Sequence, residues 1–115
     1  MRITFRDPLS QNTANEGTAF AITAKFWDDT TDAWASYTPT SISYRIDDSN
    51  GRNTLGWTTV SPAASVTLTA TVTANTLIDQ MQDRELRVMT VKVNDGLSTQ
   101  YTDTYSWYVR NTVAM

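Results

Sequence analysis

Apolar and polar residues alternate along much of the chain, and this pattern predicts β-strands. The clearest runs are residues 20–26 and 65–73, where nearly every second side chain is apolar and those between are mostly threonine, alanine or lysine. Successive side chains of a strand point to opposite faces, so each run predicts a strand with one buried face. The expected strands cover residues 3–5, 20–26, 42–46, 55–59, 65–73, 89–93 and 101–109.

Turn-forming residues separate these runs and favour antiparallel hairpins. Asn50-Gly51 and Asp95-Gly96 are strong turn signals, and Asp7-Pro8 suits the end of an edge strand because proline cannot donate to a sheet ladder. Residues 9–15 are polar and predict a loop. Residues 75–84 carry apolar side chains at helical spacing, and they predict the only helical turn, which would cross from one sheet to the other.

Seven strands with short connections predict a single domain over residues 1–115, an all-β, immunoglobulin-like antiparallel β-sandwich of about seven strands. A small β-barrel is the alternative architecture. Threonine occurs 21 times and favours strands, because its branched Cβ restricts χ1 in a helix but packs well on a sheet. We expect Trp57 to lie in the core, and Tyr44 is the best candidate for a core aromatic.

The composition argues against several kinds of chemistry. A net charge of −3 with scattered Lys and Arg disfavours a nucleic-acid partner. The absence of Cys excludes disulfides, thiolate zinc sites and cysteine nucleophiles, and the absence of His removes the commonest general base and metal ligand. No motif frames a pair of catalytic carboxylates, so we expect no enzyme and no cofactor. No apolar run approaches the roughly 20 residues that span a bilayer, so no membrane partner is expected.

Three polar segments offer the oxygen ligands that Ca²⁺ prefers. They are the loop with Asp28, Asp29 and Asp32, the turn with Asp47, Asp48 and Asn50, and the Asn94-Asp95-Gly96 turn. Their spacing matches no defined calcium loop. Solvated connections and plain turns are therefore the preferred interpretation, and no metal site is predicted.

Four aromatic residues are the candidates for a partner-binding surface: Trp27, Trp34, Tyr37 and Tyr108. Trp27 and Trp34 bracket a polar loop, and Trp34 and Tyr37 lie in a segment without a clear period. Trp and Tyr are enriched at protein interfaces and also stack on sugars, although these side chains could equally cap the end of the fold. Tyr105 and Tyr108 fall on opposite faces of the last strand, so one should be buried and the other available.

Glu16-Gly17 before Phe20-x-Ile22-x-Ala24, and Val91-x-Val93-Asn94-Asp95-Gly96 before Trp107-x-Val109-x-Asn111, cover much of the chain. These segments resemble the second strand and the last hairpin of immunoglobulin-like modules in bacterial surface proteins and in virion proteins of tailed bacteriophages. The chain departs from antibody-type domains, because Arg87 and Met89 stand where such domains carry a tyrosine and a cysteine.

The resemblance implies a non-enzymatic structural protein of a phage virion, assembled in the host cytoplasm, that decorates or cements the capsid. A chain that begins at Met1 without an export signal fits this reading better than an adhesin repeat. The implied partners are capsid or neck/tail proteins. A homo-oligomer or symmetric array is expected, because virion sites come in multiples and sheet edges are easily extended. The alternatives are a neck or tail accessory protein, and a carbohydrate or cell-surface binding module that uses Trp34 and Tyr37.

Overall fold

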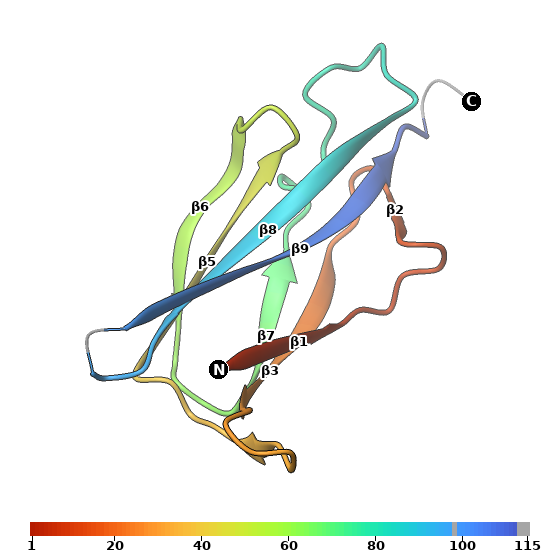
Figure 1. Ribbon diagram of the computed structural model, residues 1–115. Helices are drawn as coiled ribbons and strands as arrows, with labels where there is room; N and C mark the ends of the chain where they lie inside the picture. The colour runs from red at the N-terminus through yellow and green to blue at the C-terminus, as the bar shows by residue number, and fades with distance from the viewer. Residues whose placement is uncertain (98, 113–115) are drawn as a thin grey trace.

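The computed structural model describes residues 1–97 and 99–112, and every regular element within them is a β-strand (Figure 1). Each of the seven expected strands overlaps one of these elements, and β2 and β4 are additional. The strands are β1 (Arg2–Arg6), β2 (Thr13–Asn15), β3 (Phe20–Asp28), β4 (Ala35–Ser36), β5 (Ser41–Asp48), β6 (Asn53–Val60), β7 (Ser65–Ala70), β8 (Arg84–Asn94) and β9 (Gln100–Arg110).

The strands form two sheets. In the smaller sheet, β1 pairs antiparallel with one edge of β3, while β7 and the short β4 share the other edge. The larger sheet has the order β2-β9-β8-β5-β6, and only β2 runs parallel to its neighbour. The expectation of purely antiparallel sheets is therefore wrong at this edge. The predicted loop over residues 9–15 is wrong at Thr13–Asn15, because backbone pairing with β9 makes a strand of these polar residues.

The core lies between the two sheets, where the apolar side of each alternating run faces the other sheet. Trp107 is the largest fully buried side chain, and Phe20 meets its ring edge-on at 5.2 Å between centroids. Tyr44 is buried as expected, and its hydroxyl donates across the core to the carbonyl of Thr69 on β7 at 3.1 Å. The alternation of residues 20–26, 42–46 and 89–93 is confirmed. The buried residues of these runs are Ile22, Ala24, Phe26, Ile42, Tyr44, Ile46, Met89, Val91 and Val93.

The predicted helical turn at 75–84 is wrong, because this segment is a series of turns. Side chains of β8 replace the backbone bonds that a helix would make. Arg87 Nε and Nη2 donate to the carbonyls of Ala74 and Thr76, and Glu85 accepts the N–H groups of Ile78 and Asp79. Strand β7 also ends at Ala70, earlier than expected, and Val72 is 52% exposed instead of buried.

The expectation that Trp57 lies in the core is wrong, since the side chain is 46% exposed. The cause is a β-bulge. Tyr44 pairs with Thr58 and Ile46 pairs with Leu55, so Gly56 and Trp57 together oppose Arg45. One extra residue on one strand shifts the alternation, which turns Trp57 to the solvent side although Leu55 still packs against the core.

Candidate functional site

Two of the four predicted aromatic residues come together on the outer face of the smaller sheet. The rings of Trp27 and Trp34 lie 6.4 Å apart at an angle of 51°, and the guanidinium of Arg2 lies 4.5 Å from the centre of the Trp34 ring. Trp27 Nε1 donates to Thr4 Oγ1 at 3.0 Å, which fixes this indole against β1. Trp34 remains 46% exposed. We call Arg2, Trp27 and Trp34 the aromatic cluster.

Pairing of three strands brings the aromatic cluster together. Trp27 lies opposite Arg2 of β1 on one side and opposite Ser36 of β4 on the other. Asp29 then holds the cation in place, with its carboxylate 3.6 Å from Arg2 Nε and 3.2 Å from the amine of Met1. The hydrogen bond from that amine lowers the pKa of Asp29, which favours the charged carboxylate.

Among the described residues, neither Tyr37 nor Tyr108 makes a ring or cation–π contact with the aromatic cluster. The Tyr37 hydroxyl donates to the carbonyl of Asp95 at 3.1 Å, and burial, together with the charge of Asp95, raises the pKa of Tyr37. This residue ties the segment before β5 to the β8–β9 turn, which fits the alternative of a capping role. Tyr108 lies on the larger sheet under the guanidinium of Arg84, 4.2 Å from the ring centre. Tyr105 and Tyr108 are both partly exposed, so neither is fully buried.

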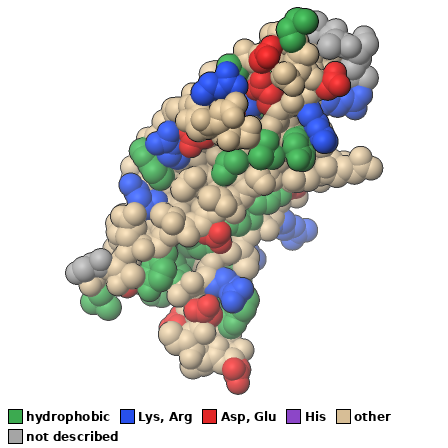
Figure 2. Space-filling model, turned by 45° about the horizontal axis from the view of Figure 1, so that its top comes forward, with side chains coloured by type: hydrophobic (Ala, Val, Ile, Leu, Met, Phe, Trp, Pro, Cys, Tyr) green, Lys and Arg blue, Asp and Glu red, His purple; other side chains and the backbone are tan. Residues whose placement is uncertain are grey.

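A second aromatic residue paired with cations lies on the outer face of the larger sheet, where it was not expected. Lys92 Nζ lies 4.2 Å and the Arg45 guanidinium 5.6 Å from the centre of the Trp57 ring. Gly56 is the one sequence signal that could have indicated the bulge, because an isolated glycine in a strand often marks one. Figure 2 shows hydrophobic side chains in separate small groups among polar atoms, with both signs of charge interspersed.

Positive charge gathers on the outer face of the smaller sheet. Arg2, Arg6 and Lys25 project from β1 and β3 on this side, among threonine and serine side chains. Within the part of the chain that the structure describes, Arg6 and Lys25 make no ion pair. A shallow hollow of about 400 Å³ lies between them and is bordered by Trp27. This face is therefore cationic in a chain whose net charge is negative.

Several carboxylates of the acidic segments accept hydrogen bonds within their own turns. Asp28 accepts the N–H and the hydroxyl of Thr30, and these bonds lower the pKa of Asp28. Burial alone would raise the pKa of Asp48, but donors from Arg52 and Asn50 lower it. Asp95 accepts the N–H of Leu97. Among residues 1–97 and 99–112, no three acidic side chains gather as a metal site would require.

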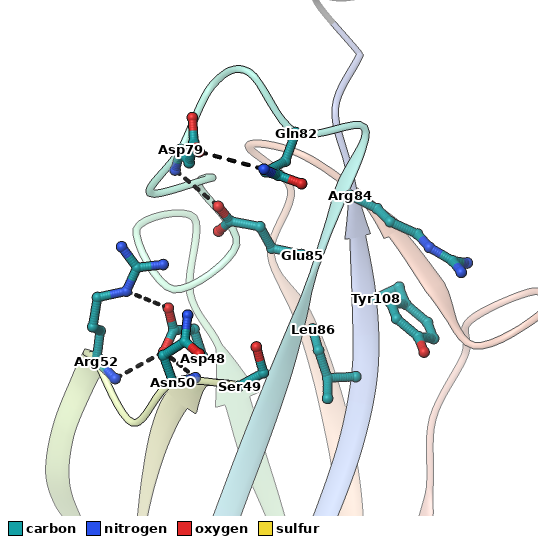
Figure 3. Close-up of a pocket in the computed structure, with 10 residues that line it drawn as sticks. All are labelled: Asp48, Ser49, Asn50, Arg52, Asp79, Gln82, Arg84, Glu85, Leu86 and Tyr108. Atoms are coloured by element: carbon teal, nitrogen blue, oxygen red, sulfur yellow. Dashed lines mark hydrogen bonds and ion pairs between the residues drawn. The ribbon is translucent and has the colours of Figure 1, made fainter.

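A polar cleft of about 420 Å³ lies between the β5–β6 turn and the segment before β8 (Figure 3). Its charged groups already have partners. Arg52 is joined to Asp48, Glu85 to the backbone of Asp79, and Arg84 turns away over the Tyr108 ring. The cleft therefore presents no pair of free carboxylates that could act as general acid and base.

No protein family, curated protein or solved structure matches the chain. In the described part of the chain, no helix is long and apolar enough to cross a membrane. The aromatic cluster and the cationic face around it are thus the surface features from which a function can be inferred.

Proposed function

We propose that this chain is a non-enzymatic, immunoglobulin-like binding module that decorates or stabilises a phage capsid through protein–protein contacts. The observation that carries the binding role is the exposed aromatic cluster on the cationic outer face of the smaller sheet. Trp and Arg are the residue types that most often dominate binding energy in protein interfaces. The assignment to a phage particle, in the capsid or alternatively in the neck or tail, rests on the sequence resemblance.

Strand order supports the immunoglobulin-like assignment. The pairing β1-β3-β7 in one sheet and β9-β8-β5-β6 in the other corresponds to the way such sandwiches divide their strands. Arg87 adds a second likeness. It lies near the start of β8, two residues before Met89, and donates to the backbone at Ala74 and Thr76. A tyrosine at that place in related domains likewise bonds to the backbone a few residues upstream.

The charges favour a protein partner with an acidic surface. Arg2 covers part of the Trp34 ring, while Arg6 and Lys25 on the same face make no ion pair with any residue that the structure describes. An acidic partner would gain charge-assisted contacts around a central aromatic anchor. A carbohydrate or cell-surface ligand is the second candidate, because Trp34 keeps 46% of its surface open and an indole can stack on a sugar.

Particles that lack the chain and are supplied with purified protein provide the test. Trp34→Ala should weaken the affinity for the particle by roughly 10- to 100-fold, the usual effect of removing an interface hot spot, and fewer copies should be retained at sub-saturating concentration. Trp57→Ala is the matched control, since Trp57 is equally exposed and also lies beside cations, but on the other sheet. Equal retention of the two variants would contradict the proposal, as would a particle proteome without this chain. Binding to a glycan array that Trp34→Ala abolishes would favour the second candidate.

A further inference from the structure

Two sheets leave edge strands whose unpaired N–H and C=O groups can pair with another chain. The edge of β1 carries the charges of Arg2 and Arg6 and is followed by Pro8, which are common guards against such pairing. The edge of β7 is blocked by a side chain from the other sheet. The Tyr44 hydroxyl lies 3.3 Å from the N–H nitrogen of Thr69 and donates to its carbonyl at 3.1 Å.

The edge of β6 is guarded by its bulge and by its own side chains. The bulge at Gly56 and Trp57 twists the strand away from a regular ladder. Asn53 Nδ2 donates to the carbonyl of Leu55 at 2.8 Å, and Thr58 Oγ1 donates to that of Gly56 at 3.0 Å. Two carbonyls of this strand are thus already bonded.

The first half of β9 is different. Strand β2 pairs only with Tyr108–Arg110, so among the described strands residues 100–107 have β8 on one side and no neighbour on the other. Tyr108 donates its N–H to Asn12 across this second side. Because backbone groups alternate along a strand, the N–H and C=O of the exposed residues Thr102, Thr104 and Ser106 point to the same open side.

Little in this segment prevents another strand from pairing. Residues 100–107 contain no Lys, Arg, Pro or Gly and are rich in Tyr and Thr, which favour strands. On the open side, the bond that the structure gives is local: the N–H of Thr104 donates to Asp103 Oδ1 at 2.8 Å. An incoming strand would replace that bond with one to its own carbonyl. A hollow of about 250 Å³ lies between Tyr101 and Asp103 of β9 and the start of β1 at Met1, Arg2 and Ile3.

We propose that the Thr102–Ser106 edge of β9 pairs antiparallel with the same edge of a second copy of this chain, about a two-fold axis at Thr104. This register places Thr102 opposite Ser106 and Asp103 opposite Tyr105, so no like charges face each other directly. About six backbone hydrogen bonds would join the two copies.

The ends of the open segment also fit this register. On one side of the axis lies the β8–β9 turn, before Gln100, and on the other side β2 begins opposite Tyr108. An axis at Thr104 lies midway between them, so residues 101–107 of the two copies pair without meeting the β2 of either. The proposal does not depend on the phage assignment, because it rests on strand pairing and not on the sequence resemblance.

Sedimentation velocity of the full chain, from low micromolar to about 1 mM, tests the pairing. We expect the mass to rise from monomer to dimer with concentration. Thr104→Pro removes an N–H only on the open side, which edge strands tolerate. Losing one hydrogen bond from each copy should weaken the dimer roughly 30-fold. Thr67→Pro is the matched control on β7. The carbonyl of Ala64 accepts from Phe26 of β3, so by alternation the N–H of Thr67 also points away from β3.

A second variant keeps the test valid if Thr104→Pro fails to fold by circular dichroism. Thr104→Lys places two ammonium groups across the axis, so its dimer should be weaker at low salt and partly recover at high salt. In the wild type, the amides of Thr102 and Ser106 should exchange more slowly with solvent as concentration rises. A wild-type chain that stays monomeric at about 1 mM would overturn the proposal, as would a Thr104→Lys dimer as tight as the wild type.

Discussion

The buried guanidinium of Arg87 should contribute more to stability than any other charged group of this chain. Its side chain is 0% exposed and makes four hydrogen bonds from β8. They run to the carbonyls of Ala74, Thr76 and Leu86 at 2.8, 2.8 and 3.1 Å, and to Glu85 Oε1 at 2.9 Å. Two of these partners, Ala74 and Thr76, lie in the turns between β7 and β8, and the other two lie on β8 itself. The substitution Arg87→Met keeps most of the buried volume and removes every donor.

The expected loss follows from what those partners retain. The buried carbonyl of Ala74 and the partly buried carbonyls of Thr76 and Leu86 would each lose a donor, which costs about 1 kcal/mol apiece. Glu85 would lose its cation but keep the N–H groups of Ile78 and Asp79, so its charge is not left entirely unpaired. Breaking a buried pair by removing one partner typically costs about 3–5 kcal/mol. We therefore expect Arg87→Met to lower the free energy of unfolding by about 3–4 kcal/mol.

Urea unfolding followed by tryptophan fluorescence measures this change, and the chain provides a close control. Arg45 also pairs with an acid two residues away on its strand, Asp47 at 2.7 Å, but on the outer face of the larger sheet. Arg45→Met should cost less than half of the Arg87→Met loss, because this ion pair is partly open to solvent, which weakens it. Equal losses for the two variants, or a loss below about 1 kcal/mol for Arg87→Met, would refute the reasoning from burial.

Three further outcomes are expected. Trp57→Ala should change the free energy of urea unfolding by no more than about 1 kcal/mol, because the indole is 46% exposed; a loss typical of a core aromatic, about 3 kcal/mol or more, would contradict the bulge. Tyr44→Phe should lower the melting temperature by an amount equivalent to about 1 kcal/mol, since the hydroxyl bonds to Thr69 would be lost; an unchanged melting temperature would argue against those bonds. The pKa of Asp48 and that of Glu85 are both lowered in the folded chain, so their stabilising effect is complete above the unfolded values, about 4, and is lost as pH falls through the folded ones. Asp48→Asn should therefore make the free energy of unfolding depend less on pH below about pH 4. The same pH dependence in the wild type and in the variant would be inconsistent with the Arg52 contacts.

The strands that could be predicted from the sequence are those with one buried and one solvated face. Residues 20–26 and 42–46 alternate in sequence because they alternate in burial, so the local pattern carries the structural information. The Asn50-Gly51 turn can be predicted from the sequence for a similar reason. Gly51 has a φ of 80°, a conformation that glycine adopts without strain. Each of these signals lies within a few residues of the feature that it predicts.

The errors fall where a distant partner decides the conformation. Residues 75–84 have helical spacing, but Arg87 and Glu85 supply hydrogen bonds that hold turns instead. Trp57 lies two residues after Leu55, a spacing that places both on the same face of a regular strand, yet one extra residue on β6 turns Trp57 outward. Thr13–Asn15 has no strand pattern and becomes a strand only because β9 pairs with it. In each case, the deciding partner is not visible in the local sequence.

The candidate site could likewise be predicted only in part from the sequence. Trp27 and Trp34 could be singled out because aromatic residues around a polar loop are candidates for an interface. Their contact, and the position of Arg2 over the Trp34 ring, depend on both β1 and β4 pairing with the end of β3. Tyr108 was grouped with them as an aromatic residue on one of the two faces of the last strand. In the fold it belongs to a different sheet and is stacked under Arg84.

The edges of a sheet depend on distant parts of the chain even more than its faces do. Whether a strand lies at an edge depends on which strands pair, and whether that edge is open depends on side chains that reach it from elsewhere. Tyr44 and Thr69 are 25 residues apart in the chain, and nothing in the alternation of β7 indicates that a hydroxyl from the other sheet occupies its edge. The open edge of β9 likewise arises because β2 is three residues long and begins only at Thr13, opposite Tyr108. A longer β2 would cover Thr104 and remove the pairing edge, although the sequence of β9 itself would be unchanged.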